Sequence, residues 1–110
     1  MDLPTPSDEE KIIAIIGSTR FKETWKQVFK KLLEKGWFPR GVECYGHADK
    51  LDEVENYHNG YKDYLEKLHK KRIKEADSVL VLNKDSYIGE STENELKLAR
   101  KLDKNIYWLE

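Results

Sequence analysis

The sequence predicts an α/β protein: a single domain built on a small parallel sheet of about four strands flanked by helices. The chain has 110 residues, which is enough for one hydrophobic core and too short for two. Short apolar runs rich in β-branched residues alternate with longer segments whose apolar residues recur at helical spacing. Because alternating strands and helices form parallel sheets through right-handed crossovers, we expect helices on both faces of the sheet.

The first half of the chain contains two expected strands and one helix. Residues 11–16 read KIIAII, a run typical of a strand buried on both faces, and Gly17 ends it. Apolar residues at helical spacing then predict a helix over residues 20–35, ended by a glycine. Residues 37–44 are expected to form the second strand, and Pro39 favours an edge position for its start.

The second half continues the same alternation. A polar connection over residues 45–60 leads to a second helix, expected over residues 61–76. The run SVLVL at Ser78–Leu82 is again typical of a buried strand. After a loop, a third helix is expected to end near Leu102, and residues 105–109 (NIYWL) form the last strand. The order is that of a small flavodoxin- or Rossmann-like domain.

Residues 1–10 (MDLPTPSDEE) differ from the rest of the chain. They contain two of the three prolines and show no apolar periodicity. We therefore expect a short flexible N-terminal tail, followed by the domain over residues 11–110.

Composition excludes several classes of partner. The 20 Lys and Arg residues balance 21 Asp and Glu residues, so nothing predicts a global attraction to nucleic acid or to anionic membranes. No apolar run approaches the roughly 18 residues of a membrane span, and the N-terminus is acidic, unlike a signal peptide. The single cysteine excludes an internal disulfide. We therefore expect a cytoplasmic protein with no nucleic-acid or membrane partner.

A metal site is not expected either. The candidate ligands are Cys44, His47, His58 and His69. Their spacing matches no familiar zinc pattern, and no acidic residue is placed to complete a set. We expect neither a metal nor another cofactor.

Open α/β sheets bind ligands beyond the carboxyl ends of their strands. In this chain, that rule selects four segments, which should converge on one edge of the sheet: residues 17–20, 45–49, 83–85 and 89–95.

The turn Gly17-Ser18-Thr19-Arg20 directly follows the first strand. Glycine permits a tight turn, helix amides would point at a ligand, and Arg20 adds a fixed positive charge, so the turn could hold a phosphate or carboxylate. Alternatively, Ser18 or Thr19 only caps the following helix and Arg20 is solvated. The spacing leaves both interpretations open.

Thr92 and Glu95 lie at the start of the third helix and also have two interpretations. The spacing Thr92-x-x-Glu95 matches a capping box, which the spacing alone favours. In the functional interpretation, the Glu95 carboxylate lies one turn into the helix, where the helix dipole would keep it ionised and able to act as a nucleophile.

His69 lies on the expected second helix, beside apolar residues of the buried stripe. A half-buried histidine is the common outcome for such a position. A role in general acid–base catalysis requires only a path to the ligand-binding edge.

Three motifs together resemble the nucleoside 2-deoxyribosyltransferase superfamily, including its 2′-deoxynucleoside 5′-monophosphate N-glycosidase branch. Residues 17–20 are similar to the family's G-S-x-R turn, and residues 75–81 to its "AD" followed by a hydrophobic strand. Residues 92–96 are similar to its G-T-x-x-E-L segment. The resemblance covers most of residues 11–109.

The resemblance implies an enzyme that cleaves or transfers an N-glycosidic bond. Glu95 would take the role of the nucleophile, attack C1′ of the 2-deoxyribosyl group and form an ester that water or a second base resolves. His69 stands where the family usually has an aspartate, and His69 or His47 could protonate the leaving base.

The resemblance also implies the ligand contacts. Arg20 and Ser18 would bind a 5′-phosphate, and Asn83 and Ser91 the sugar hydroxyls. The other expected substrate-binding residues are Gly17, Thr19, His47, Gly89 and Thr92. Family members commonly form dimers, so a homodimer or higher homo-oligomer that binds a small nucleoside or nucleotide is expected. The alternatives are a non-catalytic nucleotide-binding module of the same fold and a purely structural domain.

Overall fold

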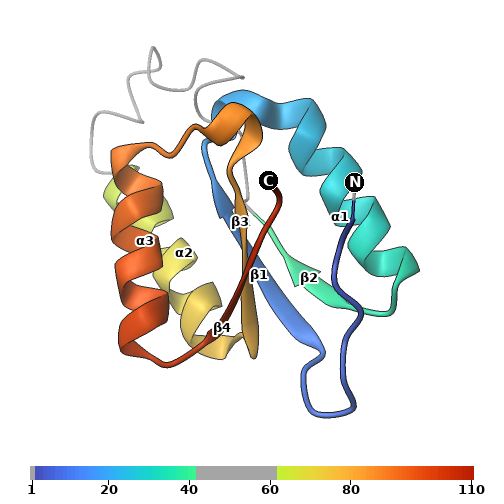
Figure 1. The fold of residues 1–110 in the computed structure, drawn as a ribbon. Coiled ribbons are helices and arrows are strands. Elements are labelled where there is room, and N and C mark those ends of the chain that lie inside the picture. Colours follow the sequence, from blue (N-terminus) through green and yellow to red (C-terminus); the bar gives the residue numbers. More distant parts are fainter. Residues whose placement is uncertain (1, 42–61) are drawn as a thin grey trace.

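The computed structural model describes residues 2–41 and 62–110 and contains a four-stranded parallel sheet in the order β2-β1-β3-β4 (Figure 1). The predicted fold class is thereby confirmed: a small Rossmann-like α/β domain. The strands are β1 (Ile12–Gly17), β2 (Phe38–Arg40), β3 (Ser78–Leu82) and β4 (Asn105–Trp108).

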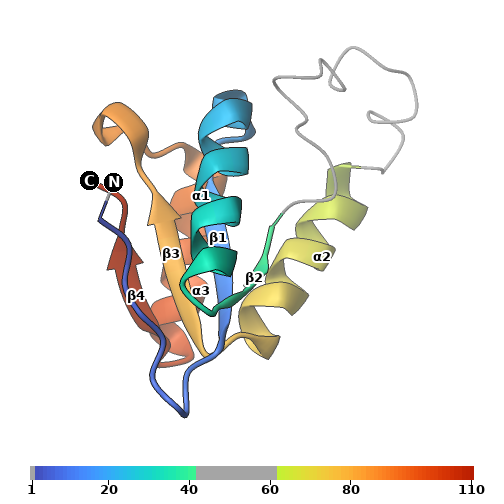
Figure 2. The same cartoon turned by 90° about the vertical axis from the view of Figure 1, so that its right-hand side faces the viewer.

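Helices cover both faces of the sheet. They are α1 (Lys22–Glu34), α2 (Lys62–Glu75) and α3 (Glu90–Lys101), with short 3-10 turns at η1 (Thr19–Phe21) and η4 (Lys84–Ser86). Helix α1 lies on one face, and α2 and α3 lie together on the other (Figures 1 and 2). Because the strands are parallel, α2 and α3 both begin at the carboxyl end of the sheet, where a ligand would bind.

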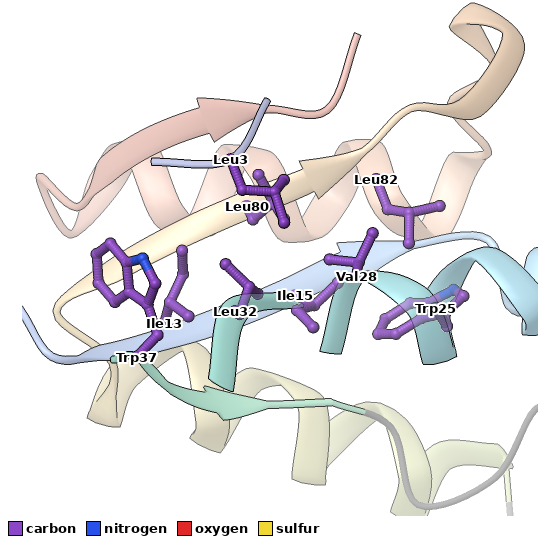
Figure 3. Packing of buried hydrophobic residues seen from close by; sticks show 9 residues of the cluster. All are labelled: Leu3, Ile13, Ile15, Trp25, Val28, Leu32, Trp37, Leu80 and Leu82. Carbon is purple, nitrogen blue, oxygen red and sulfur yellow. The ribbon is translucent and has the colours of Figure 1, made fainter. Parts of the chain in front are cut away.

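The apolar run of β1 serves both faces, because successive side chains of a strand point to opposite sides. Ile13 and Ile15 belong to the cluster under α1, shown in Figure 3, whereas Ala14 and Ile16 pack toward α2 and α3. Burying each large aliphatic side chain contributes roughly 1.5–3 kcal/mol, so this two-sided burial explains why the run is continuous rather than alternating.

The N-terminal segment packs against the domain, whereas the sequence predicts a flexible tail. Leu3 is only 5% exposed and belongs to the α1-side cluster. The indole Nε1 of Trp37 donates to the carbonyl of Pro4 at 2.8 Å, and Tyr107 Oη donates to the Glu10 carboxylate at 3.1 Å. Since α1 is the one described helix on this face, the segment covers apolar surface that α1 leaves open (Figure 2). Local periodicity does not reveal such packing.

Of the second strand predicted over residues 37–44, residues 42–44 lie outside the described residues. Strand β2 covers Phe38–Arg40 and pairs with β1 at the edge of the sheet, as Pro39 predicts. The polar connection expected over residues 45–60 lies outside the described residues.

Candidate functional site

The carboxyl ends of β1 and β3 lie side by side, with Gly17 opposite Leu82. A Cβ at residue 17 would lie 2.8 Å from the Cβ and 2.9 Å from the carbonyl oxygen of Leu82, so this close approach requires glycine. The segments that follow both strands therefore share one edge of the sheet, which we call the rim: residues 17–20, 83–89 and the first turns of α2 and α3.

Ser18 caps the turn after β1. Its Oγ accepts a hydrogen bond from the backbone N–H of Arg20 at 3.3 Å. Its carbonyl accepts from the indole Nε1 of Trp25 at 2.8 Å and from the N–H of Phe21 at 3.3 Å. The structure thus shows the capping role considered for Ser18. The side chain of Thr19 is half-buried in the same turn.

Arg20 is held by an aromatic ring from the loop after β3. Its guanidinium carbon lies 4.4 Å from the centroid of the Tyr87 ring. Phe21 contacts the same ring edge-on, with centroids 5.9 Å apart and an interplanar angle of 74°. Arg20 is exposed, as the alternative of a solvated charge predicts, and it also contacts this ring. Nothing in the sequence pattern pointed to Tyr87.

Thr92 and Glu95 do not form a capping box. Helix α3 begins at Glu90 with Gly89 as its N-cap, and the N–H of Glu93 donates to the Gly89 carbonyl at 3.0 Å. The helix thus starts before Thr92, which is 2% exposed inside the first turn. Glu95 follows one turn later on the same face of α3.

Glu95 is held in its neutral form at neutral pH. Burial and, to a smaller extent, the charge of Glu66 raise its pKa to about 8, although Lys70 opposes both. We expected the helix dipole to keep Glu95 ionised, and this expectation is wrong. The dipole acts mainly within the first turn, and at Glu95 the loss of hydration outweighs it.

His69 lies on α2 and carries a buried Nε2 atom that no described residue hydrogen-bonds. Burial lowers its pKa, although the nearby Glu66 carboxylate raises it. A neutral imidazole whose second ring nitrogen has no hydrogen-bond partner among the described residues can relay a proton from one nitrogen to the other.

Four ionisable side chains of α2 and α3 are linked by their electrostatic effects on one another, and we call them the polar layer: Glu66, His69, Lys70 and Glu95. The helices pack against each other. Beside and beyond these residues, Ile73 of α2 and Leu96 and Ala99 of α3 belong to one buried apolar cluster. Glu66 was missed at the level of sequence, although it stands one helical turn before His69.

The other predicted site residues have varied positions. The Asn83 side chain donates to the carbonyl of Glu110 at 3.0 Å and accepts from the N–H of Glu110 at 2.8 Å, so its amide ties the loop after β3 to the chain end. Ser91 is exposed in the first turn of α3, and Gly89 is its N-cap. His47 lies outside the described residues.

The described residues were also searched for groups that could bind a metal ion and for helices that could span a membrane. Within residues 2–41 and 62–110, no group of three or more His, Cys, Asp or Glu side chains could hold a metal ion. Cys44, His47 and His58 lie outside these ranges. In the described part of the chain, no helix has both the length and the apolar character needed to cross a membrane.

Comparison with known proteins finds no family model that matches the chain and no match among curated proteins.

Proposed function

We propose that the protein cleaves or transfers the N-glycosidic bond of a (deoxy)nucleoside or nucleoside 5′-monophosphate, with Glu95 as the nucleophile. The observation that carries the proposal is the polar layer: a carboxyl group whose pKa is raised to about 8 shares the charged neighbour Glu66 with a half-buried histidine, on helices that begin at the carboxyl end of a parallel sheet. Strongly shifted pKa values at such a position favour a catalytic site over a structural one.

The reaction requires an ionised nucleophile and a protonated leaving group. Glu95, once ionised, attacks C1′, and the bonding electrons of the C1′–N bond pass to the departing base. Glu95 releases its proton to water before the attack, and the departing base takes a proton from water, which neutral His69 can relay, with His47 the other candidate donor. Water or a second base then resolves the glycosyl ester, which makes the protein a hydrolase or a transferase.

Residues of the rim would hold the substrate. Arg20, with Ser18, is proposed to bind the 5′-phosphate, because guanidinium groups recognise phosphate through paired N–H donors. Ser91, exposed at the start of α3, is proposed to bind a sugar hydroxyl. The amide of Asn83 would have to release Glu110 to do the same, so its proposed part is to shape the loop.

A chromatographic assay for free base tests the proposal. Deoxynucleosides, ribonucleosides and their 5′-monophosphates are incubated at pH 8 with wild type, Glu95→Ala or Glu93→Ala, with and without an acceptor base. Glu93 is the matched control, because it is an exposed carboxylate on the same helix. Base release by wild type and Glu93→Ala alone supports the proposal, and dependence on the acceptor separates a transferase from a hydrolase. Equal release by Glu95→Ala contradicts the role of Glu95.

The second candidate function is nucleotide binding without cleavage. The neutral state of Glu95 near pH 7 favours it, as does the presence of His69 where the family usually has an aspartate. A thermal shift with nucleotides but no released base at any pH would decide for this candidate.

We also propose that the protein acts in the cytoplasm as a homodimer or higher homo-oligomer, as superfamily members commonly do. Three large apolar side chains on α1 and β2 are partly exposed and offer contact surface: Phe29, Leu33 and Phe38. Light scattering should then give at least twice the chain mass of 13.0 kDa, and a particle of 13.0 kDa would contradict the proposal.

A further inference from the structure

Arg20 and Tyr87 come from loops that follow different strands, β1 and β3, and they meet at the rim. The guanidinium carbon lies 4.4 Å from the ring centroid, within the range in which the face of an aromatic ring attracts a cation. The contact joins the two loops that lie on either side of the close approach of Gly17 to Leu82.

Contacts on both sides fix the Tyr87 ring. Phe21 meets it edge-on with ring centroids 5.9 Å apart. On its own loop, the N–H of Tyr87 donates to the Lys84 carbonyl at 3.0 Å. Asp85 and Ser86 just before it have positive φ angles of 56° and 61°, a conformation that non-glycine residues rarely adopt. This tight turn directs the chain so that Tyr87 reaches Arg20.

A guanidinium placed over an aromatic face is attracted to the ring without needing its N–H groups for a conventional hydrogen bond. Its five N–H donors therefore stay able to bind an anion. A freely rotating arginine loses side-chain entropy when it binds an anion, whereas one already held on a ring loses less. The ring should therefore strengthen anion binding without contacting the anion.

We propose that Tyr87 is a positioning residue that holds Arg20 for the phosphate of the substrate and so sets the preference for nucleoside 5′-monophosphates over nucleosides. The inference rests on the proposed function, within which it assigns a role to a residue that would not touch the substrate.

The test measures dissociation constants by calorimetry for the four common 2′-deoxynucleoside 5′-monophosphates and the matching nucleosides. All proteins carry Glu95→Gln so that the ligand is not consumed. Tyr87→Leu should weaken monophosphate binding by about two- to fivefold, as expected for one exposed cation–π contact, and leave nucleoside binding unchanged. Tyr87→Phe should keep the wild-type ratio, because it keeps the ring. Ile88→Ala, an exposed neighbour on the same loop, is the control.

A double-mutant cycle separates positioning from a general effect on the loop. If Tyr87 acts through Arg20, Tyr87→Leu should have no further effect on phosphate binding in an Arg20→Ala background. An unchanged ratio of monophosphate to nucleoside affinity in Tyr87→Leu overturns the inference, as does an equal loss for both ligands. Wild-type protein that binds both ligands equally well overturns it too.

The binding data do not depend on turnover. Selective loss of monophosphate binding in Tyr87→Leu, combined with no base release by wild type, would overturn the proposed function and keep this inference.

Discussion

Asp77 and Glu95 are carboxylates at opposite ends of the same sheet, and their environments shift their pKa values in opposite directions. Asp77, at the amino end of β3, accepts hydrogen bonds from the N–H groups of Lys11 and Ile12, each at 2.9 Å. These bonds lower its pKa. Glu95, toward the carboxyl end, is half-buried, and the loss of hydration raises its pKa to about 8.

The opposite pKa shifts of Asp77 and Glu95 indicate different roles for the two ends of the sheet: one carboxylate stabilises the fold, and the other is available for catalysis. The Asp77 carboxylate is stabilised in its charged form and ties the start of β1 to the start of β3. Glu95 is destabilised in its charged form, which costs folding free energy and leaves a reactive group once the proton is removed. We therefore assign stability to the amino end of the sheet and chemistry to the rim.

The largest effect is expected from removing the ring nitrogens of His69 in the polar layer. His69→Phe should lower turnover by about 10²- to 10⁴-fold, the usual contribution of a positioned acid or base. The fold should persist, because the change removes a buried nitrogen that no described residue hydrogen-bonds. Base release and thermal unfolding measure the two effects, with Lys71→Ala, an exposed change on the same helix, as the control. Wild-type turnover in His69→Phe would show that His69 takes no part in the proton transfer.

The rate of base release should rise with pH. Only about one Glu95 carboxyl in ten is ionised at pH 7 if its pKa is about 8, so the rate should increase roughly fiftyfold from pH 6 to pH 8. It should level off above the pKa. Initial rates over this range, measured at saturating substrate, provide the check. A rate that is flat from pH 6 to pH 8 would show that ionisation of Glu95 does not limit turnover.

Stability should change with pH in the opposite sense. Folded Glu95 keeps a proton that the unfolded chain releases between the ordinary pKa of 4.5 and about 8. Rising pH therefore favours unfolding in this window, by at most about 1.4 kcal/mol per pH unit. Glu95→Gln should flatten this decline, as urea unfolding at a series of pH values would show. An unchanged slope in Glu95→Gln would mean that Glu95 titrates normally.

At the other end of the sheet, Asp77→Ala should cost stability and leave catalysis intact. It removes two hydrogen bonds to a charged acceptor, and solvent exposure limits the loss to about 1–2 kcal/mol. Because the pKa of Asp77 is lowered, its contribution is complete above the unfolded-state pKa and is lost as the pH falls through the folded value. Urea unfolding at pH 7 and at pH 3 would show a smaller difference between variant and wild type at pH 3. Slower turnover in correctly folded Asp77→Ala would contradict the assignment of stability to the amino end of the sheet and catalysis to its carboxyl end.

The smallest expected effect is a shift of the Glu95 pKa when its charged neighbours on α2 are replaced. Glu66→Gln should lower the pKa of Glu95 by removing a negative charge, and Lys70→Met should raise it by removing a positive one. The midpoint of the pH–rate profile should therefore move in opposite directions in the two variants. Movement in the same direction would indicate a structural change in the layer instead.

The fold could be predicted because its signals are local. The run at 11–16 and the run at Ser78–Leu82 are apolar throughout, and in the structure they are the two central strands, buried on both faces. The packing of Leu3 could not be predicted, because it depends on surface that α1 leaves uncovered. The capping box that the spacing Thr92-x-x-Glu95 favours does not form, because the helix begins at Glu90 with Gly89 as its N-cap.

The sequence predicts where the candidate site lies, but not the ionisation state of Glu95 or the side chain that Arg20 contacts. The order of the strands is sufficient to bring residues 17–20 and the first turns of α3 to the same edge. The ionisation of Glu95 depends on how α2 packs against α3, and Glu66 contributes to it from a different helix. The contact of Tyr87 with Arg20 depends on a turn with positive φ angles at two non-glycine residues, which no motif indicates.

The most direct test of the central claim is to look for the glycosyl ester on Glu95. Wild-type protein is mixed with deoxynucleoside 5′-monophosphates at pH 8.5, quenched with acid within milliseconds, digested and mapped by mass spectrometry. The account predicts a 2-deoxyribosyl phosphate adduct on the peptide that contains Glu95, absent from Glu95→Gln. Base release without any adduct on that peptide, or an adduct on another residue, would contradict it.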